Sequence, residues 1–464
     1  MADTENKGAV DWQLNKATLT HKKNKTYEIT AGLINFSYYE SLENLNPTAT
    51  IVFSDNKTEM NCKDGDKIEI NLMTTAHTDD DEWVHVFDVE QVETKTVDGA
   101  KIYSLHLITP HSIRPSTYNY QKALQGTAKQ ILTKVFDDAK GKTEALPIVT
   151  DGNEPFNNFK FMKGKKKVTD IVHNICTGSI PASGKTANTA GYFLWGTKKG
   201  IIGNKDTYNL HFKSIDSLLS VGGDHGGEDA EYEYYESNNA STVDIPAQLI
   251  ISNFEVSKRG NCKKMCDDGV FKAKVILYNL DSKKYSKRSW DLRDYWDGWG
   301  HIARTPGTDP WESSEIVEEF MDSETPAKTF MLEISHEKFH DDKDPAKPGQ
   351  IGAGETDEGE KTQSATFQDW DEETIVQYHA RYATMLMSTS NMTIPGNQYL
   401  HAGDKVKIYL RDSRPDAKTD VDSYDKELSG HYLIYKMRQY YSMVPKKECY
   451  SALTLVRDTL NKNC

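Results

Sequence analysis

Long apolar segments are missing from this 464-residue chain, whose mean hydropathy is -0.69. A membrane-spanning helix needs about 20 mostly apolar residues in succession, and the sequence contains no such run. Residues 1–13 also lack the basic and apolar segments of a secretory signal. We therefore expect no membrane insertion, and a protein that is made and retained in a cytoplasm.

Cysteine is scarce, with six scattered residues of which only Cys262 and Cys266 lie close together. Three residues separate these two, whereas redox motifs and zinc knuckles have two. We therefore interpret the cysteines as reduced thiols and expect no metal site among them.

Positive charge is in deficit, because 56 Lys and Arg stand against 70 Asp and Glu and the net charge is -14. A surface of this sign repels the phosphates of DNA. The balance argues against an ordinary nucleic-acid-binding protein. It still allows a surface along which DNA passes without being held.

Short β-rich segments fill the first 110 residues. Apolar and polar residues alternate in several of the segments 48–53, 67–72, 83–92 and 102–109, and turn residues lie between them. This pattern predicts a small all-β barrel or sandwich.

Helical spacing begins after Pro110. Apolar residues within 124–136 fall on one helix face, and those within 168–176 form a second. Two predicted strands follow, at 192–195 and 208–212, so this part indicates an α/β domain.

The remaining part mixes polar stretches with predicted strands. Residues 222–240 and 341–364 have linker-like compositions. We expect a helix near 372–387. Strands are predicted at 249–256, 271–278, 406–410, 432–437 and 451–456.

The most informative feature is an internal similarity between the two ends of the chain. Gly65-Asp66-Lys67 introduces an alternating strand, and so does a second Gly-Asp-Lys triplet near the C-terminus. In both copies two further strands follow in the same order. The similarity predicts two related β-domains with other domains inserted between them. The second triplet consists of Gly403, Asp404 and Lys405.

A chain of this kind has a physical use in an assembly. Three copies would present six similar β-domains around one axis, and could join a six-fold tube to a three-fold spike. Barrel edges that are exposed in one copy can pair with those of the next, which leaves no free edge.

Several short segments carry a resemblance to a known family. The most specific is 392–400 (MTIPGNQYL), which contains Pro395 and Gly396. The others are 107–113 (LITPHSI), 268–271 (DGVF), 278–280 (YNL), 402–404 (AGD), 429–434 (SGHYLI) and 453–458 (LTLVRD). In these segments and in the order of its elements, the chain resembles the central hub protein of contractile-tailed phage baseplates. That family is shared with the base of type VI secretion spikes.

The resemblance implies a homotrimeric structural protein without catalytic activity or cofactor. It implies contact with the tail tube protein and a central spike, and passage of the genome through the ring at ejection. Because the chain ends just after the second predicted barrel, we expect the spike to be a separate protein. The expected location is the baseplate of a virion assembled in the host cytoplasm, where wedge proteins are further possible neighbours.

These expectations give an α+β, multidomain chain. We divide it into a first tube-like β-barrel domain (1–110) and an inserted α/β domain (111–225). A second tube-like β-barrel domain with a connecting helix follows (226–280 and 371–464), interrupted by a peripheral insertion (281–370) that has no clear counterpart in the family.

A zinc peptidase is one alternative. The segment 336–340 (HEKFH) fits H-E-x-x-H, in which a helix places His336 and His340 on one metal ion and Glu337 acts as general base. Pro345 and the acidic residues before it would break such a helix soon after the second histidine. We therefore predict no metal site here and keep the two histidines as the weaker candidates.

A carbohydrate-binding tail adhesion protein is the other alternative. The segment 290–299 (WDLRDYWDGW) is rich in aromatic and charged residues, which can form a platform for sugar rings. The same composition is typical of protein interfaces and cores, because aromatic side chains anchor such contacts.

Overall fold

The structure is a computed structural model that describes most, but not all, of the chain. The described residues are 12–21, 25–56, 60–74, 83–97, 99–110, 118–139, 147–150, 155, 158–161, 164–180, 191–198, 208–221, 228–236, 246–279, 284–302, 315–322, 328–334, 374–411, 424–425 and 427–459.

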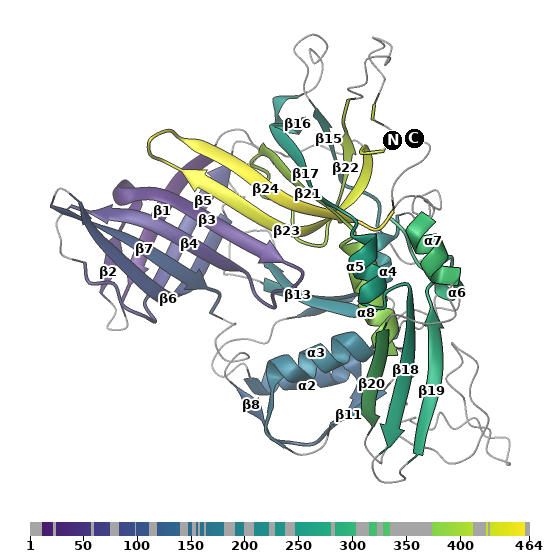
Figure 1. The fold of residues 1–464 in the computed structure, drawn as a ribbon. Coiled ribbons are helices and arrows are strands. Elements are labelled where there is room, and N and C mark those ends of the chain that lie inside the picture. Colours follow the sequence, from purple (N-terminus) through teal and green to yellow (C-terminus); the bar gives the residue numbers. More distant parts are fainter. Residues whose placement is uncertain are drawn as a thin grey trace.

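The chain has a mixed α+β structure in which strands predominate and form several sheets (Figure 1). The largest is a 14-stranded sheet with strands from both ends of the chain. Smaller sheets and helices lie beside it. The predicted α+β class is therefore confirmed at this level.

The first half of the large sheet pairs antiparallel in the order β2-β1-β5-β6-β7-β4-β3. Alternate residues point to one buried face, as in β4, where Ala49, Ile51 and Phe53 are buried. The predicted strands in this part are therefore present. The elements are β1 (Trp12–Thr20), β2 (Thr26–Glu28), η1 (Thr30–Gly32), β3 (Leu33–Ser41), β4 (Thr48–Asp55), β5 (Lys67–Thr74), β6 (Trp83–Val97) and β7 (Ala100–Ile108).

The second half comes mainly from the end of the chain, and one apolar core contacts both halves. Its strands pair in the order β17-β21-β24-β23-β22-β15-β16, and the last two contacts are parallel. The elements are β15 (Tyr232–Glu236), η2 (Ala247–Leu249), β16 (Ile250–Ile251), β17 (Asn253–Arg259), β21 (Ser388–Pro395), β22 (Lys405–Tyr409), β23 (Gly430–Ser442) and β24 (Glu448–Arg457).

Strand β15 corrects the prediction of a linker over residues 222–240. Tyr232 and Tyr234 are buried and belong to the apolar core, so the segment alternates like any half-buried strand. The acidic, glycine-rich residues before it masked that alternation, and the pairing that holds it comes from the distant β22.

The inserted α/β part packs two helices against short strands around a core of its own. Residues Leu124–Thr127 form strand β9 rather than the start of the predicted helix. Thr127 and Gln130 explain the boundary, because each backbone N–H bonds the other side chain, as in a capping box. The other elements are β8 (Asn119–Tyr120), α2 (Ala128–Ala139), β10 (Ile148–Thr150), β11 (Asn158–Phe161), β12 (Lys166–Lys167), α3 (Val168–Gly178), β13 (Tyr192–Lys198), β14 (Tyr208–Ser214) and α4 (Ile215–Leu219).

A third part contains a separate sheet with the order β19-β18-β20. Strand β18, which the sequence division places with the second β-domain, pairs only within this sheet among the described strands. Helix α8 packs against it through Val376 and Ala380. The elements are α5 (Cys262–Asp267), β18 (Lys272–Asn279), β19 (Lys284–Asp291), α6 (Arg293–Trp296), α7 (Glu315–Asp322), β20 (Lys328–Ile334) and α8 (Thr374–Met385).

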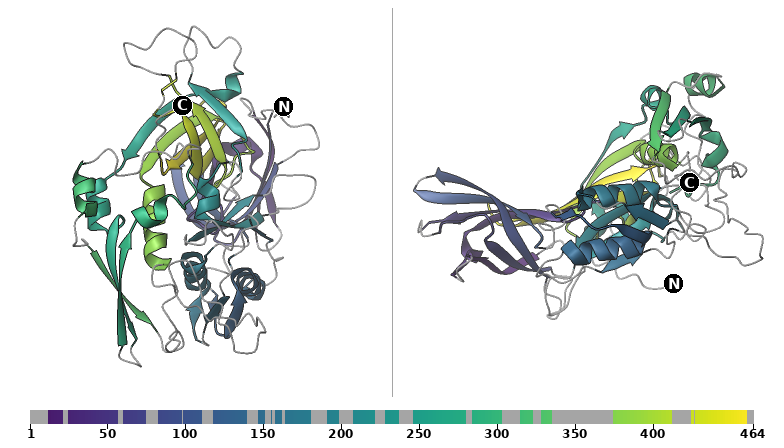
Figure 2. Two further views of the ribbon diagram at one scale, coloured as in Figure 1. Left: turned by 90° about the vertical axis from the view of Figure 1, so that its right-hand side faces the viewer. Right: turned by 90° about the horizontal axis from the view of Figure 1, so that it is seen from below.

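The views in Figure 2 show how these parts are arranged. Seen from below, the first-half strands extend to one side, away from α2 and α3. The third part lies on the other side of the molecule from them (Figure 1).

A buried ion cluster joins these parts at α8. The guanidinium of Arg381 contacts Asp216 at 3.0 Å and Asp458 at 2.8 Å, and it also bonds the carbonyl of Gly300. His301 Nδ1 lies 2.9 Å from the same Asp458 carboxylate. Burial alone would raise the pKa of Asp458, but the charges of His301 and Arg381 hold it below its usual value.

Replacing Arg381 with Met should lower the free energy of unfolding by about 3–5 kcal/mol, because the buried Asp216 loses its cation and the buried Asp458 keeps only His301. Arg293→Met is the matched control. Arg293 is 41% exposed and pairs with Asp291 and Asp322 at the surface, so its loss should cost less than about 1 kcal/mol. Urea denaturation measures the free energy of unfolding of both variants. Equal losses would contradict the role of Arg381 in a buried ion cluster.

Candidate functional site in the seam of the large sheet

The two halves of the large sheet meet in a seam between β23 and β3. The strands pair antiparallel from Lys436 opposite Ser41 to Ser442 opposite Asn35. Two segments about 400 positions apart in the chain therefore form one continuous sheet (Figure 1).

Side chains on both faces reinforce the seam. On the inner face the rings of Phe36 and Tyr441 stack with centroids 6.0 Å apart. On the outer face Arg438 donates to Ser37 Oγ at 3.0 Å and lies over the ring of Tyr39. The contact thus combines a backbone ladder with cross-strand packing.

The first Gly-Asp-Lys triplet forms a turn that is bonded to β6. Gly65 has a φ of 77°, which favours glycine, and its N–H donates to the carbonyl of Val89 at 2.8 Å. The N–H of Val89 donates to the carbonyl of Asp66 at 2.8 Å. The Asp66 carboxylate accepts from the N–H of Lys63 at 2.8 Å.

The second triplet repeats each of these contacts. Gly403 has a φ of 96°, and its N–H donates to the carbonyl of Ile434 at 2.9 Å. The N–H of Ile434 donates to the carbonyl of Asp404 at 2.8 Å. The Asp404 carboxylate accepts from the N–H of His401 at 2.7 Å.

The lysines of the two triplets differ. Lys67 is exposed, whereas Lys405 is buried and donates to the carbonyls of Ser217 at 3.0 Å and Glu228 at 2.9 Å. Burial lowers the pKa of Lys405 to about 8. The second turn therefore contacts the α/β part through its buried lysine, whereas the lysine of the first turn is exposed to solvent.

The similarity extends to the strands. The first half contains the pairing order β3-β4-β7-β6-β5, and the second contains β17-β21-β24-β23-β22, all antiparallel. A register shift interrupts β6 directly after Val89 and β23 directly after Ile434. The halves differ at the next strand, because β1 joins β5 antiparallel and β15 joins β22 parallel.

Pro395 and Gly396 lie at the end of β21. The N–H of Gly396 donates to the carbonyl of Cys449 at 3.2 Å, and a Cβ at this glycine would overlap the Cys449 side chain. The next residue, Asn397, donates to the hydroxyl of Tyr234 at 3.1 Å. These residues therefore serve close packing between strands.

The buried carboxylate of Glu40 is a site residue that the sequence analysis missed. Its side chain has no solvent exposure. It accepts hydrogen bonds from the Tyr38 hydroxyl at 2.6 Å, from the Ala402 N–H at 3.0 Å and from the Lys198 N–H at 3.3 Å. Its remaining partner is His401, whose Nδ1 lies 3.1 Å away.

The Glu40–His401 contact controls the charge of both groups. Burial raises the pKa of Glu40, but the charge of His401 and its hydrogen bond bring it below its usual value. Burial likewise lowers the pKa of His401, but Glu40 and the nearby Asp404 raise it to about 9. Burial raises the pKa of Asp404 to about 6. At neutral pH the seam thus contains an imidazolium between carboxylates.

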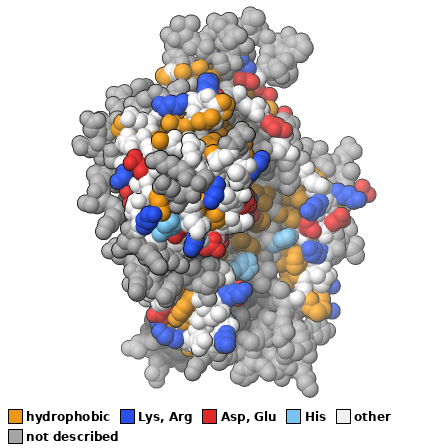
Figure 3. All heavy atoms as spheres, turned by 90° about the vertical axis from the view of Figure 1, so that its left-hand side faces the viewer, with side chains coloured by type: hydrophobic (Ala, Val, Ile, Leu, Met, Phe, Trp, Pro, Cys, Tyr) orange, Lys and Arg blue, Asp and Glu red, His pale blue; other side chains and the backbone are white. Residues whose placement is uncertain are grey.

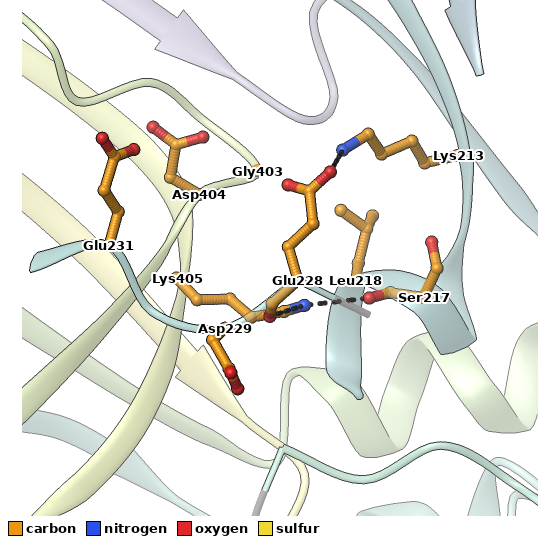
Figure 4. A pocket seen from close by; sticks show the side chains of 9 residues that line it. All are labelled: Lys213, Ser217, Leu218, Glu228, Asp229, Glu231, Gly403, Asp404 and Lys405. Atoms are coloured by element: carbon orange, nitrogen blue, oxygen red, sulfur yellow. Dashed lines mark hydrogen bonds and ion pairs between the residues drawn. The ribbon is translucent and has the colours of Figure 1, made fainter. Parts of the chain in front are cut away.

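A small polar cavity lies beside the second turn (Figure 4). Lys213 and Lys405 reach toward Glu228 from different elements, and Asp404 and Glu231 line the same hollow. Its volume of about 40 Å³ has room for a few water molecules rather than a substrate. The cavity belongs to the packing of the turn.

The residues of the alternative interpretations are placed differently. His336 and His340 lie outside the described residues. Trp290, Trp296 and Trp299 are at most 3% exposed and pack in the core of the third part, so their rings form no sugar platform.

Two further observations apply to the described residues alone. They include no cluster of three or more His, Cys, Asp or Glu side chains that could hold a metal ion. None of their helices combines the length and apolar character needed to cross a membrane.

No protein-family model and no curated protein matches the sequence. The structure is nevertheless similar to the tail protein from Neisseria meningitidis MC58, with a TM-score of 0.52 and 8% identity over 97% of each chain. The two proteins share a fold.

Two other solved structures match over nearly the whole chain. The 43 kDa tail protein of prophage MuSo2 from Shewanella oneidensis has a TM-score of 0.48 and 9% identity, over 96% of this chain and 99% of that one. The E. coli c3393 protein, a component of the type VI secretion system similar to the T4 bacteriophage tail proteins gp27 and gp5, has a TM-score of 0.44 and 7% identity. That match covers 98% of this chain and 79% of the other.

The stabilising contribution of His401 to the free energy of unfolding should decrease by about 1–2 kcal/mol between pH 6.5 and 8, while the lowered pKa values of His85 and His211 act in the opposite sense over the same range. The pKa of His401 is about 9 in the fold and ordinarily near 6.5, so its stabilising effect is complete below about pH 6.5 and is lost as the pH rises through 9. Above pH 8, Lys405 has the opposite effect on stability, because its pKa is lowered in the fold and the folded state gains stability as the pH rises. The measurement therefore ends at pH 8.

His401→Gln should remove this decrease, measured by urea denaturation across the window. The control is His106→Gln, because His106 is 43% exposed and its ring lies 3.7 Å from the exposed Glu93 carboxylate. An unchanged pH profile in His401→Gln would contradict the charged pair.

Replacing Gly403 with Ala should destabilise the protein by more than about 3 kcal/mol, because a Cβ there meets the Trp195 ring and the positive φ adds strain. Gly99→Ala is the matched control, since Gly99 has a φ of 84° and open space around it. It should cost about 1–2 kcal/mol. Equal costs in thermal or urea unfolding would refute the close contact.

Proposed function

We propose that this chain is a structural subunit of a phage tail baseplate, its central hub, and that it catalyses no reaction. The observation that supports this most is the repeated Gly-Asp-Lys turn, with the same hydrogen bonds and the same strand order in both halves of one sheet. A duplicated β-unit is what a symmetry-matching subunit requires.

In this proposal the halves are two related tube-type barrel domains. The first is formed by residues 1–110 and the second by 226–280 with 371–464, while 111–225 and 281–370 are outer insertions. The matching shift after Val89 supports common descent, because a bulge in one strand has no reason to recur by chance at the corresponding place. The parallel β15 is then a later change in the second unit.

Three copies would form a ring of six similar units. Such a ring matches a hexameric tail tube protein on one side and a separate trimeric spike on the other. The fold shared with a tail protein supports this role. Wedge proteins of the baseplate are candidates for contact with the outer insertions.

The chemistry of the sheet's outer face supports passage of the genome without binding. Along β4 and β7 this face presents neutral side chains such as Thr50, Val52 and Ser104. On the side of the first-half strands, acidic and basic groups are interspersed among the described residues (Figure 3). Because the chain has a net charge of -14, we expect it to offer DNA phosphates no continuous basic track.

The oligomeric state tests the hub function. Native mass spectrometry of the full chain should give a particle of three 52.5 kDa subunits, and electron microscopy should show a three-fold ring with six similar lobes. A protein that stays monomeric at every concentration would contradict the proposal.

A further inference from the structure

The large sheet contains a continuous path of strands with two unpaired ends. The path runs β17-β21-β24-β23-β3-β4-β7-β6. Beyond Asp88, β6 pairs only with β7 among the described strands, and residues 90–97 are mostly exposed. Among the strands that the structure describes, β17 also has a single partner, β21.

These two free edges correspond to the two strands of the seam. In the seam, the part of β23 beyond its register shift pairs with β3. In the repeated strand order, β6 of the first half corresponds to β23, and β17 of the second half corresponds to β3. We propose that β6 of one copy pairs antiparallel with β17 of a neighbouring copy, in the register of the seam. This inference rests on the duplicated unit of the proposed function and adds the contact that joins the copies.

The match between β6 and β23 sets one side of the register. Val89 and Ile434 make the same two hydrogen bonds to their turns, and each precedes a one-residue shift. Counting from these positions, Lys95 corresponds to Tyr440, which lies opposite Ser37 in the seam.

The match between β3 and β17 sets the other side. Ser37 pairs with Thr50 of β4, and Glu255 pairs with Asn391 of β21. Thr50 and Asn391 in turn pair with corresponding positions of β7 and β24. Glu255 therefore corresponds to Ser37.

The transferred register places Lys95 directly opposite Glu255 of the neighbouring copy. Both are exposed in the single chain, and they carry opposite charges. On the other face it places Thr96 opposite Phe254, which is half-buried against the core. A slip by one residue would separate the charges and turn each face over, so the pairing is specific.

The contact uses different surfaces on the two partners. Each copy contributes one β6 edge and one β17 edge, so the association is head-to-tail and is complete only when it closes into a ring. Closure also removes the free edges that would otherwise invite nonspecific pairing.

A cysteine pair tests the register. Lys95→Cys combined with Glu255→Cys should form an intermolecular disulfide under mild oxidation, giving dimer and trimer bands on non-reducing gels. The yield should be roughly ten-fold above that of either single variant or the wild type. The reason is that the Cα atoms of two directly opposite strand residues lie at a separation that a disulfide can span. Lys95→Cys with Ser252→Cys is the control, since Ser252 falls three positions away on the opposite face.

Charge reversal provides a second test that does not depend on oxidation. Lys95→Glu and Glu255→Lys should each raise the concentration of half-dissociation roughly five-fold, and the double reversal should restore it. Glu69→Lys, an exposed reversal on β5 away from both edges, should leave association unchanged. Additive losses in the double variant would overturn the proposed pair.

The outcomes separate this inference from the hub function. A trimer without the specific disulfide overturns the β6–β17 contact and leaves the hub function in place. The disulfide in an assembly of another size supports the contact and overturns the three-fold ring. A chain that never associates overturns both.

Discussion

The buried carboxylate of Glu40 is the group on which the arrangement of this protein depends. A carboxylate without solvent must be compensated by donors, because an unpaired buried charge costs several kcal/mol. Here the donors come from β3 itself, from the turn at His401 and Ala402, and from Lys198 at the end of β13. The first half, the second half and the α/β part are therefore coupled through one charge.

The duplicated unit shows how one local structure serves two purposes. Both Gly-Asp-Lys turns bond the neighbouring strand in the same way, because a positive φ and an aspartate cap suit any such entry into a strand. Only the second turn receives the Trp195 ring, whose indole N–H donates to the Ala402 carbonyl at 2.8 Å. The burial of Lys405 follows from the same docking.

Most strands and helices were predictable, because their signals are local. The alternation in β4 and the helical spacing in α3 depend only on neighbouring residues, and both elements form where expected. The linker prediction was wrong at β15, because its partner β22 lies about 170 residues away. Glu40 gave no usable signal either, since a glutamate in an alternating strand is ordinarily exposed.

By itself, the sequence determined where many of the strands and helices lie, the two turns that begin the related strands, and the acidic charge balance. Periodicity, glycine positions and composition are sufficient for these. Only the tertiary structure decided that β3 joins β23, that three parts surround one buried carboxylate, and which edges remain free. Those contacts join backbone groups and hydrogen-bond donors that lie hundreds of residues apart in the chain. No local sequence pattern predicts them.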